Sequence, residues 1–514
     1  MSSPMQPDPE PLRALVVGGG VAGLVAAREL AARGVAVALF EAANYCGGRI
    51  AGVQVDGVNF DLGAEAFATR GGAVAELVEE LGIGHRIVAP ASHGSWLVTP
   101  SGATPMPASG TMGIPVAPFS PATRRVLGIP GAARAAAEAC LPRVRRRPAS
   151  DTTLAELVRA RLGHRVLERL VRPVALGVYS RRPEEIRIDE VPGLAAEIRR
   201  AGSLRAAAGA LRRSTSAAGG AVSGLRGGMS DLIGALIGDI ERRGGRITTG
   251  TTVAATEFVA GHGAPDEVGG AGGEWILRGG SGDELARAEL LVLAVPRAEA
   301  ARMLGDGAAG ISSRAGAPET EVEVVLLVID DERLDAAPRG TGALVAGAPH
   351  GGIRAKALTH VTAKWPLRAQ ELPAGRHALR LSYGSLQHAP ATAGLGDDDA
   401  YALALADASR ILGVALDPSK VRGQARQRWR IPPAPRRRGA AAGPGSGAGS
   451  GPGTLALVGD SVHGTGLASV VPAARAAAGD LLRAHAGSRG TRREGTRVDD
   501  PQHEEPQDEG RKTT

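Results

Sequence analysis

The first strong pattern along the chain is a short apolar run, a glycine-rich turn and a helical repeat. Residues 14–18 (ALVVG) have the composition of a buried strand, and apolar positions then recur at helical spacing as far as about Arg33. A second strand-like run, VAVALFE, follows at residues 35–41. Strand, helix and strand in this order predict two parallel strands joined by a helical crossover.

Two later runs have the same character, and a different pattern lies between them. ELLVLAVP (289–296) and TLALVGD (454–460) are short apolar runs of the buried, parallel type. The strand-like runs at 321–330, 353–365 and 377–384 are not each followed by a helix. This predicts a second sheet domain, mixed or antiparallel, inserted between pieces of the first.

Residues 121–215 are rich in alanine and arginine and show helical periodicity, without a strand pattern of comparable strength. This pattern predicts a helical lobe. The expected fold class is therefore α/β, with a discontinuous Rossmann-like nucleotide-binding domain, an inserted mixed-sheet substrate domain and this lobe. The expected boundaries are 11–90, 221–300 and 421–486 for the first domain, 91–220 for the lobe and 301–420 for the mixed sheet.

Three segments have the composition of disordered or linker sequence. Residues 1–10 are rich in proline, and residues 487–514 hold almost no apolar side chains that could offset the entropy of ordering. Residues 432–453 (PPAPRRRGAAAGPGSGAGSGPG) have linker composition. We expect a disordered tail at each end and a surface insertion between Trp429 and the strand TLALVGD.

Composition narrows the classes of function. A chain of 514 residues is too long for one core, and its two cysteines, Cys46 and Cys140, lack the spacing of a disulfide framework or a thiolate metal site. We therefore expect a reducing, cytoplasmic setting. The net charge of +7 comes mostly from arginines spread along the chain, with few aromatic residues, which argues against nucleic-acid binding. The start MSSPMQPDPE is unlike a secretory signal, and charges interrupt the apolar run that follows, unlike a membrane span.

The glycine-rich turn carries the clearest chemistry. The G-x-G-x-x-G spacing between a strand and a helix is formed by Gly18, Gly20 and Gly23. The first glycine allows a tight turn, the second close approach of a diphosphate, and the third close packing of the helix on the strand. Glu41 ends the next strand, where a carboxylate can accept hydrogen bonds from the adenosine ribose hydroxyls. The residues of this predicted dinucleotide site are Gly18, Gly19, Gly20, Val21, Ala22, Gly23, Glu41 and Ala42.

The segments that follow distinguish between dinucleotides. CGGRI (46–50) and VNFDLGAEAF (58–67) come after the acidic strand end. In this order the motifs resemble the flavin amine oxidase superfamily, and within it the protoporphyrinogen and coproporphyrinogen oxidases, of the bacterial coproporphyrinogen III oxidase type. The resemblance implies FAD as the cofactor and places Gly48 and Arg49 beside its diphosphate, an anion that suits a guanidinium. The residues expected to line the isoalloxazine ring are Gly63, Ala64, Glu65 and Ala66.

Further matches to that branch run along residues 12–485. The segments RPVALGVYSRRPEEIRIDEVPGLAAEI (172–198), GLRGGMSDLIGAL (224–236) and KALTHVTAKWP (356–366) resemble stretches of the family. RITTGTTVAATE (246–257) resembles the strand whose valine, here Val253, meets the adenine. The insertion after Trp429 replaces the usual lead-in to the final strand, and Trp429 itself is expected at the cofactor.

The activity implied by the resemblance is oxidation of coproporphyrinogen III to coproporphyrin III, or of protoporphyrinogen IX to protoporphyrin IX, in heme biosynthesis. Oxygen would reoxidise the FAD. Because the chemistry is centred on the flavin, no catalytic side chain and no metal site is expected, and the sequence holds no HExxH or paired Cys/His spacing. Substrate propionates call for arginines, and the candidates are Arg70, Arg181 and Arg182.

A second glycine-rich turn leads into a helix close to residue 466. TLALVGD has the pattern of a strand, and HGTG then leads into a helix with apolar positions at the spacing of a buried face. The start of that helix attracts anions, and the resemblance directs it at the N1 and C2 carbonyl edge of the reduced flavin. We expect the two turns to hold one FAD from opposite ends of the chain. The residues expected here are Gly459, Asp460, Gly464, Gly466, Leu467 and Ala468.

Two alternatives stay open from the sequence. One is another flavin oxidoreductase, an amine oxidase or a carotenoid desaturase, although only four tyrosines are available to frame a flavin as amine oxidases do. The other is a non-catalytic flavin- or tetrapyrrole-binding protein that delivers intermediates. Peripheral membrane contact, and hand-off of product to the next heme-pathway enzyme, are also left open.

Overall fold

The computed structural model describes residues 11–107, 109–144, 151–217, 222–260, 273–305, 319–347, 351–431, 454–464 and 466–494. The expected N-terminal tail and the insertion at 432–453 lie outside the described residues. Helix α15 (Leu467–Glu494) continues past residue 487, where a tail is expected to begin, and residues 495–514 are again outside.

A five-stranded parallel sheet forms from three separate stretches of the chain. Its order is β10-β2-β1-β14-β20, and every neighbouring pair runs parallel. The central strands β1 and β14 are almost wholly buried, as expected for parallel strands covered on both faces. The five strands are β1 (Arg13–Val17), β2 (Ala36–Phe40), β10 (Arg246–Thr248), β14 (Leu290–Leu293) and β20 (Leu455–Leu457).

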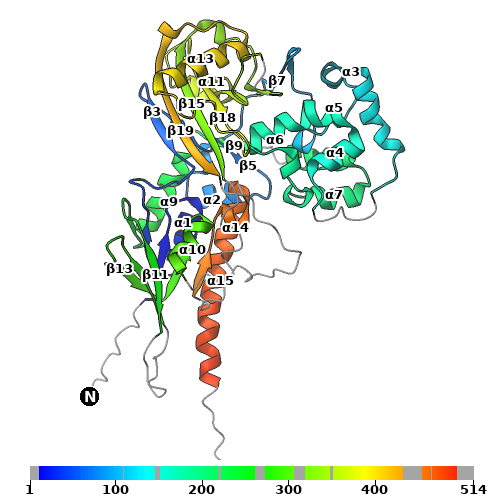
Figure 1. The fold of residues 1–514 in the computed structure, drawn as a ribbon. Coiled ribbons are helices and arrows are strands. Elements are labelled where there is room, and N and C mark those ends of the chain that lie inside the picture. Colours follow the sequence, from blue (N-terminus) through cyan, green and yellow to red (C-terminus); the bar gives the residue numbers. More distant parts are fainter. Residues whose placement is uncertain are drawn as a thin grey trace, which may run out of the picture.

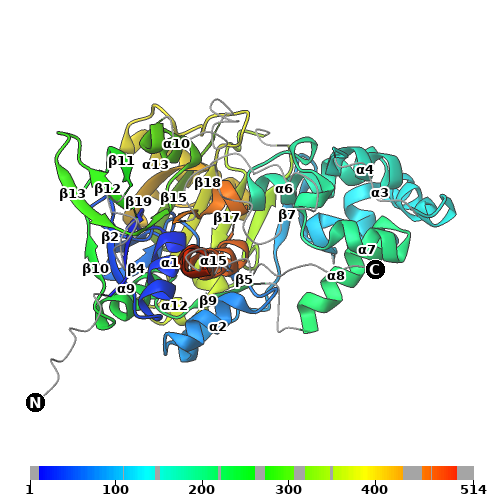
Figure 2. The ribbon, with the colours of Figure 1, turned by 90° about the horizontal axis from the view of Figure 1, so that it is seen from below.

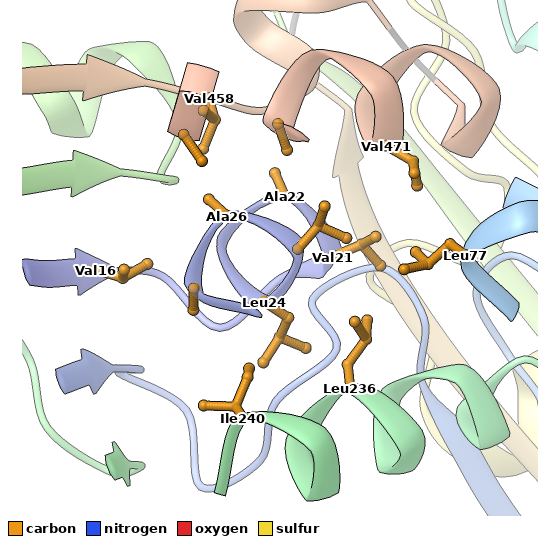
Figure 3. Packing of buried hydrophobic residues seen from close by; sticks show 14 of the residues in the cluster. Val16, Val21, Ala22, Leu24, Ala26, Leu77, Leu236, Ile240, Val458 and Val471 are labelled. Atoms are coloured by element: carbon orange, nitrogen blue, oxygen red, sulfur yellow. The ribbon is translucent and has the colours of Figure 1, made fainter. Parts of the chain in front are cut away.

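Helix α1 (Val21–Ala31) is the centre of this domain, because all 11 of its residues are buried. Figure 3 shows it between α9 (Ser230–Arg242), α15 and α2 (Ala73–Glu80), with Val16 of the sheet beside it. A helix buried on every side must be covered from several directions. Segments from both ends of the chain therefore pack on α1.

The opposite face of the parallel sheet is covered by a three-stranded antiparallel sheet and by helix α10 (Arg297–Leu304). A further small sheet runs along the side of the domain that carries α2. The strands of the antiparallel sheet are β11 (Ala255–Val259), β12 (Glu274–Arg278) and β13 (Glu284–Ala288). Those of the further small sheet are β5 (Phe67–Ala68), β9 (Val222–Leu225) and β6 (Ile87–Val88).

A seven-stranded mixed sheet forms the second domain, at the top of Figure 1. Its order is β19-β15-β18-β17-β16-β7-β8, antiparallel except for the pair β16 and β7. Helix α13 (Asp397–Leu412) packs on one face and the hairpin of β3 (Gly52–Val55) and β4 (Val58–Asp61) on the other. The strands are β7 (Trp96–Thr99), β8 (Gly102–Pro105), β15 (Thr320–Asp330), β16 (Gly342–Val345), β17 (Ala357–His360), β18 (Arg376–Tyr383) and β19 (Val421–Ile431).

The membership of this sheet differs from the expected domain boundaries at 91 and 420. Strands β7 and β8 come from the stretch assigned to the helical lobe, and β19 comes from the stretch assigned to the nucleotide-binding domain. Strand β19 pairs with β15 along nearly its whole length, and this pairing makes it part of the mixed sheet. Its alternation of polar and apolar residues predicts a strand but not the sheet that it joins.

Helices α3 to α8 form a lobe beside the two sheets, at the right of Figures 1 and 2. The lobe has an aliphatic core, which includes Leu154, Leu167 and Ile198 and extends to Leu97 and Ala346 of the mixed-sheet domain. The architecture thus confirms the expected α/β fold class. No helix in the described ranges combines the length and the apolar character that crossing a membrane requires. The lobe helices are α3 (Pro121–Ala136), α4 (Leu154–Leu162), α5 (His164–Val166), α6 (Arg172–Tyr179), α7 (Leu194–Ala201) and α8 (Leu204–Ala217).

Helix α1 carries one buried arginine, which ties the surrounding helices together. Arg28 is 7% exposed and reaches Glu80 of α2 at 2.6 Å and Asp239 of α9 at 3.0 Å. The neighbouring Glu29, also buried, lies 3.5 Å from Arg475 of α15. A buried charge requires partners, and here three different helices supply them.

We expect Arg28→Met to lower the free energy of unfolding by about 3 kcal/mol, because it leaves the buried carboxylates of Glu29 and Asp239 without their shared cation. Arg33→Met is the matched control. Its side chain is 45% exposed and pairs with Glu29 at 2.8 Å, so its loss should cost about 1 kcal/mol or less. Urea unfolding of the two variants and the wild type measures both values. Equal losses would show that the Arg28 network is not a main source of stability.

Candidate active site

Two glycines of the first turn are required by the protein's own packing. At Gly18, which has φ +106°, a Cβ would lie 2.6 Å from the carbonyl oxygen of Ala294. At Gly23 a Cβ would lie 1.9 Å from the carbonyl oxygen of Gly18. These two positions let the turn, helix α1 and strand β14 approach one another closely.

Gly20 differs from both, because no atom lies within 4 Å of the Cβ that it lacks. It is the N-cap of α1, and no side chain caps this helix start. The packing of the protein therefore gives no reason for a glycine here. Open space at the N-terminus of a buried helix suits the diphosphate of a dinucleotide, whose negative charge the helix dipole favours.

The carboxylate of Glu41 lies against the same turn, at the end of β2. Its Oε2 accepts a hydrogen bond from the Gly19 amide at 2.6 Å, and its Oε1 accepts one from the Ala43 amide at 2.8 Å. The loop with Gly47 and Gly48 also packs here, since the Gly47 amide donates to the Gly19 carbonyl at 2.9 Å. The structure thus brings the glycine turn, the acidic strand end and the loop before Arg49 together.

The second glycine turn lies beside the first. Gly459, with φ +121°, follows β20, and its missing Cβ would lie 4.0 Å from the side chain of Ala22 on α1. Asp460 opens the short helix α14 (Asp460–His463) and forms an ion pair with Arg49. Residues expected at the cofactor from the two ends of the chain are therefore in direct contact.

The turn then leads into α15 through two glycines in the left-handed region. Gly464 has φ +89° and Gly466 has φ +98°, and neither has an atom within 4 Å of the Cβ position. Helix α15 begins at Leu467, followed by Ala468, and Thr465 lies outside the described residues. This second helix start, like the first, has open space around its glycines.

The loop at 62–66 is held in place by the mixed-sheet domain. Trp429 of β19 donates from Nε1 to the Leu62 carbonyl at 2.9 Å, and Arg380 of β18 donates to the Gly63 carbonyl. The Ala64 amide donates to the Arg49 carbonyl at 3.0 Å. The sequence places Trp429 at the cofactor, and the structure places it against the backbone of the loop expected to line the ring.

Glu65 is the centre of a buried charge cluster. Lys364, at the end of α11 (Val361–Lys364), pairs with Oε1, and Arg380 pairs with Oε2 at 2.9 Å. Burial opposes ionisation of this carboxyl, but Lys364 and then Arg380 outweigh it and hold the pKa of Glu65 at about 2. The cluster therefore carries two positive charges against one negative charge.

Arg380 is a site residue that the sequence does not single out. It lies in the strand RHALRLSY, where Arg376, Arg380 and Ser382 alternate with more apolar positions, as in an ordinary strand with one polar face. Its contacts with Gly63 and Glu65 join residues more than 300 positions apart in the chain. The only local signal is an arginine between two apolar residues.

A small cavity of about 20 Å³ lies beside this cluster, lined by Asp61, Glu65, Trp365 and Arg368 among others. The Met229 amide donates to both oxygens of the Asp61 carboxyl, at 3.0 and 3.1 Å. Burial raises the pKa of Asp61 to about 6, although the Met229 amide and Arg368 oppose that rise. The buried Nη2 of Arg368 has no hydrogen-bond partner among the described residues, so the cavity has the room and the polarity for one water molecule.

Val253 lies apart from these groups, at the start of the antiparallel sheet. Its side chain is buried, at 2% exposure, and belongs to the same core cluster as Phe40. Within the described ranges, no backbone hydrogen bond involves the amide or the carbonyl of Val253. A free main chain beside the end of β2 suits an adenine, which is the role expected for this residue.

The three candidate substrate arginines are not brought together. Arg70 lies at the second turn, where its Nη2 donates to Ser469 of α15 at 3.2 Å. Arg181, after helix α6, is engaged with Glu190 at 2.6 Å and with the Glu185 carbonyl. The backbone amide of Arg182 donates to Glu185 at 2.9 Å. Of the three, only Arg70 contacts an element of the candidate cofactor site.

Comparison with known families decides the class of this site. Residues 21–482 match the family described as flavin containing amine oxidoreductase. The chain belongs to this family. The resemblance drawn from the motifs is confirmed.

Relatives of this flavin containing amine oxidoreductase carry the name of one branch. This chain is 30% identical to the coproporphyrinogen III oxidase of Mycobacterium tuberculosis (strain CDC 1551 / Oshkosh) over 476 residues, which span 91% of this chain and 97% of that protein. The coproporphyrinogen III oxidase of Mycobacterium leprae (strain TN) is also 30% identical, over 485 residues, with the same shares of the two chains covered.

Solved structures agree on the fold. The "putative protoporphyrinogen oxidase" of Exiguobacterium sp. 255-15 superimposes with a TM-score of 0.71 at 22% identity, covering 93% of this chain and 99% of that one. Cyclohexylamine oxidase of Brevibacterium oxydans IH-35A superimposes with a TM-score of 0.60 at 15% identity, covering 93% and 100%. At these identities the likeness establishes the fold that this oxidoreductase shares with them.

Asp61 predicts a pH dependence of stability. Its pKa in the folded protein, about 6, lies above its usual value of 3.8, so folding favours the protonated carboxyl. The stability from this group is present at low pH and is lost as the pH rises through about 6. From about pH 4 to about pH 7, the wild type should lose roughly 3 kcal/mol relative to Asp61→Asn.

Urea unfolding at a series of pH values measures this difference. Asp399→Asn, at an exposed position in the first turn of α13, is the control and should not remove the slope. Parallel pH profiles of the wild type and Asp61→Asn would contradict the assignment of the slope to this carboxyl.

Proposed function

We propose that this protein binds FAD and oxidises coproporphyrinogen III to coproporphyrin III in heme biosynthesis, with oxygen as the final electron acceptor. Two observations support the proposal. Asp460 and Gly459 of the second glycine turn contact Arg49 and Ala22 near the first, and relatives over nearly the whole chain are named coproporphyrinogen III oxidase. A cytoplasmic location belongs to the same proposal.

FAD fits the residues that are present. The open N-terminus of α1 at Gly20 would hold the diphosphate, and Glu41 would accept hydrogen bonds from the ribose. Val253 would offer its free main chain to the adenine. The loop at 63–66 and the N-terminus of α15 would face the ring. When bound, FAD would supply the two-electron acceptor for hydrogen removed from the substrate.

Arg49 would bind the diphosphate while keeping Asp460 as a partner. Its side chain is 38% exposed and pairs with Asp460, which is 18% exposed. A guanidinium between a carboxylate and a diphosphate can bind both, since its five donors exceed the needs of one carboxylate. We infer that Asp460 orients Arg49 toward the cofactor.

The charge cluster around Glu65 would set the electrostatic potential where the site would face the flavin ring. Lys364 and Arg380 leave one net positive charge after pairing with Glu65. A fixed positive charge in a poorly hydrated site favours negative charge that develops on a neighbouring group during the reaction. The side chains would thus orient the loop and stabilise charge, and no strong side-chain base is required.

Arg70 is the residue that we propose for a substrate propionate. It contacts Ser469 in the first turn of α15 and is more exposed than the buried cluster around Glu65. A bidentate guanidinium suits a carboxylate. Arg181 is already engaged with Glu190, which makes it the weaker candidate.

Cofactor retention tests the first glycine turn. Gly20→Val should fold, because the position has open space, but its side chain would fill the place of the diphosphate. Glu41→Ala should remove the ribose contact. We expect each to keep less than about a tenth of the wild-type flavin after gel filtration. Gly234→Val, on the open face of α9, is the matched control and should keep its flavin.

The flavin-to-protein absorbance ratio measures retention, and circular dichroism confirms folding. The assignment of the turn is wrong if Gly20→Val and Glu41→Ala both purify with full, tightly bound FAD.

Anaerobic mixing of the purified holoprotein with coproporphyrinogen III tests the reaction. We expect the flavin absorbance to bleach under anaerobic conditions. When oxygen is admitted, hydrogen peroxide should form and the fluorescence of coproporphyrin should appear. Protoporphyrinogen IX and putrescine are tested in parallel. The first tests the alternative porphyrinogen substrate, and the second tests an amine oxidase activity. Bleaching by putrescine alone would favour an amine oxidase, and an unchanged spectrum with all three would overturn the oxidase proposal.

A further inference from the structure

Two histidines of the mixed sheet are buried against each other. His360 ends strand β17 and is fully buried, and His377 of β18 is 7% exposed. Nε2 of His360 lies 3.1 Å from Nδ1 of His377. On its other side, Nε2 of His377 lies 3.0 Å from Oδ1 of Asp335, whose side chain is 60% exposed. These three side chains form a hydrogen-bonded chain from the surface into the sheet.

The carboxylate of Asp335 determines which ring atoms of His377 donate. A carboxylate only accepts hydrogen bonds, so Nε2 of His377 donates to it, and Nδ1 of the neutral ring is an acceptor. Burial holds the pKa of His377 below its usual value, although Asp335 and Asp331 oppose that fall. Burial also lowers the pKa of His360 to about 3. Both rings are therefore neutral at neutral pH, and Nδ1 of His377 accepts.

This acceptor holds the start of the short helix α11. Oγ1 of the buried Thr362 lies 3.2 Å from Nδ1 of His377, and it accepts a hydrogen bond from the Ala378 amide at 3.4 Å. The hydroxyl hydrogen of Thr362 is thus available to His377. A helix of four residues is not stable by itself, and no side chain caps this one at His360. The start of α11 therefore depends on its bonds to strand β18.

Helix α11 carries the lysine of the charge cluster around Glu65. Lys364 is the last residue of α11, two positions after Thr362, and its Nζ pairs with the carboxylate of Glu65. Glu65 belongs to the loop at 62–66, which we expect to line the flavin ring. Each step from His377 to this loop is a direct contact or a stretch of helix backbone.

We propose that His377, oriented by Asp335, is a positioning residue for Lys364: it fixes the start of α11 and thereby keeps the ammonium group on Glu65. The cluster has its second positive charge at the loop only while Lys364 stays in place. The inference rests on the proposed function, in which this charge lies beside the flavin ring. It adds a residue that touches neither the flavin nor the substrate.

Acetylation of the purified protein with acetic anhydride tests the positioning without relying on flavin chemistry. The chain has four lysines, so mass spectrometry can follow each one, and the exposed Lys420 is a reference within the same molecule. Thr362→Val keeps the shape of the side chain and removes the hydroxyl. We expect acetylation of Lys364 relative to Lys420 to rise roughly fivefold in Thr362→Val and in His377→Leu, because each loses a buried hydrogen bond.

Two matched controls accompany these variants. His377→Asn places an oxygen where Nδ1 of the ring lies, so it should keep the acceptor and most of the protection of Lys364. Thr123 of the helical lobe is 1% exposed, and its hydroxyl accepts a hydrogen bond from Ser120 at 2.8 Å. Thr123→Val therefore removes a buried threonine hydroxyl elsewhere and should leave the reactivity of Lys364 unchanged.

The midpoint potential of the bound FAD tests the electrostatic consequence. Lys364→Met removes one positive charge while Glu65 keeps Arg380, so we expect a shift to a more negative potential. Thr362→Val should shift the potential in the same direction by a smaller amount. In the Lys364→Met background it should add no further shift, because its effect passes through Lys364. Reductive titration against a reference dye measures these values.

The outcomes distinguish this inference from the proposed function. If the wild type binds no FAD or oxidises no porphyrinogen, the proposed function fails, and the acetylation pattern still decides whether His377 positions Lys364. If the proposed function holds and neither Thr362→Val nor His377→Leu raises the reactivity of Lys364, the role of His377 alone is overturned. An equal rise in Thr123→Val would indicate general loosening of the fold and would also overturn it. An unchanged potential in Lys364→Met would overturn the link from this lysine to the flavin.

Discussion

The complete burial of helix α1 is the constraint on which the rest of the structure depends. The helix that presents Gly20 to a ligand has no exposed residue, and it carries both Arg28 and Glu29 into the interior. Arg28 and Glu29 pair with each other, and α2, α9 and α15 supply further partners for them. The same packing that stabilises the domain therefore aligns the two glycine turns, and no separate device is needed to bring them together.

The mixed sheet contributes to the site in a second way. Trp429 and Arg380 bind carbonyls of the loop at 62–66, and Lys364 and Arg380 bind the carboxylate of Glu65. The loop belongs to the nucleotide-binding domain, yet its conformation is set by side chains of the other domain. The mixed sheet and the domain of the parallel sheet are therefore held together at this loop.

Local spacing determined what could be predicted from the sequence. The turn at Gly18 to Gly23, the acidic end at Glu41 and the helix after Gly466 follow from short patterns, and the structure has a strand, turn or helix at each. The place of β19 and the contacts of Arg380 could not be predicted, since both depend on pairing across sheets between distant segments. The sequence favours Arg70 over Arg181 as a propionate ligand, but the contacts of Arg70 with Ser469 and of Arg181 with Glu190 could not be predicted from it.

The strand order of the parallel sheet has a consequence for synthesis of the protein. β1 is made first, but its neighbour β14 and the edge strand β20 are separated from it by most of the chain. While the chain is on the ribosome, α1 lacks the cover of α15, and the glycine turn lacks its counterpart. The nascent protein must hold this helix without its final partner until translation has passed residue 482, so the two glycine turns can come together only after almost the whole chain has been made.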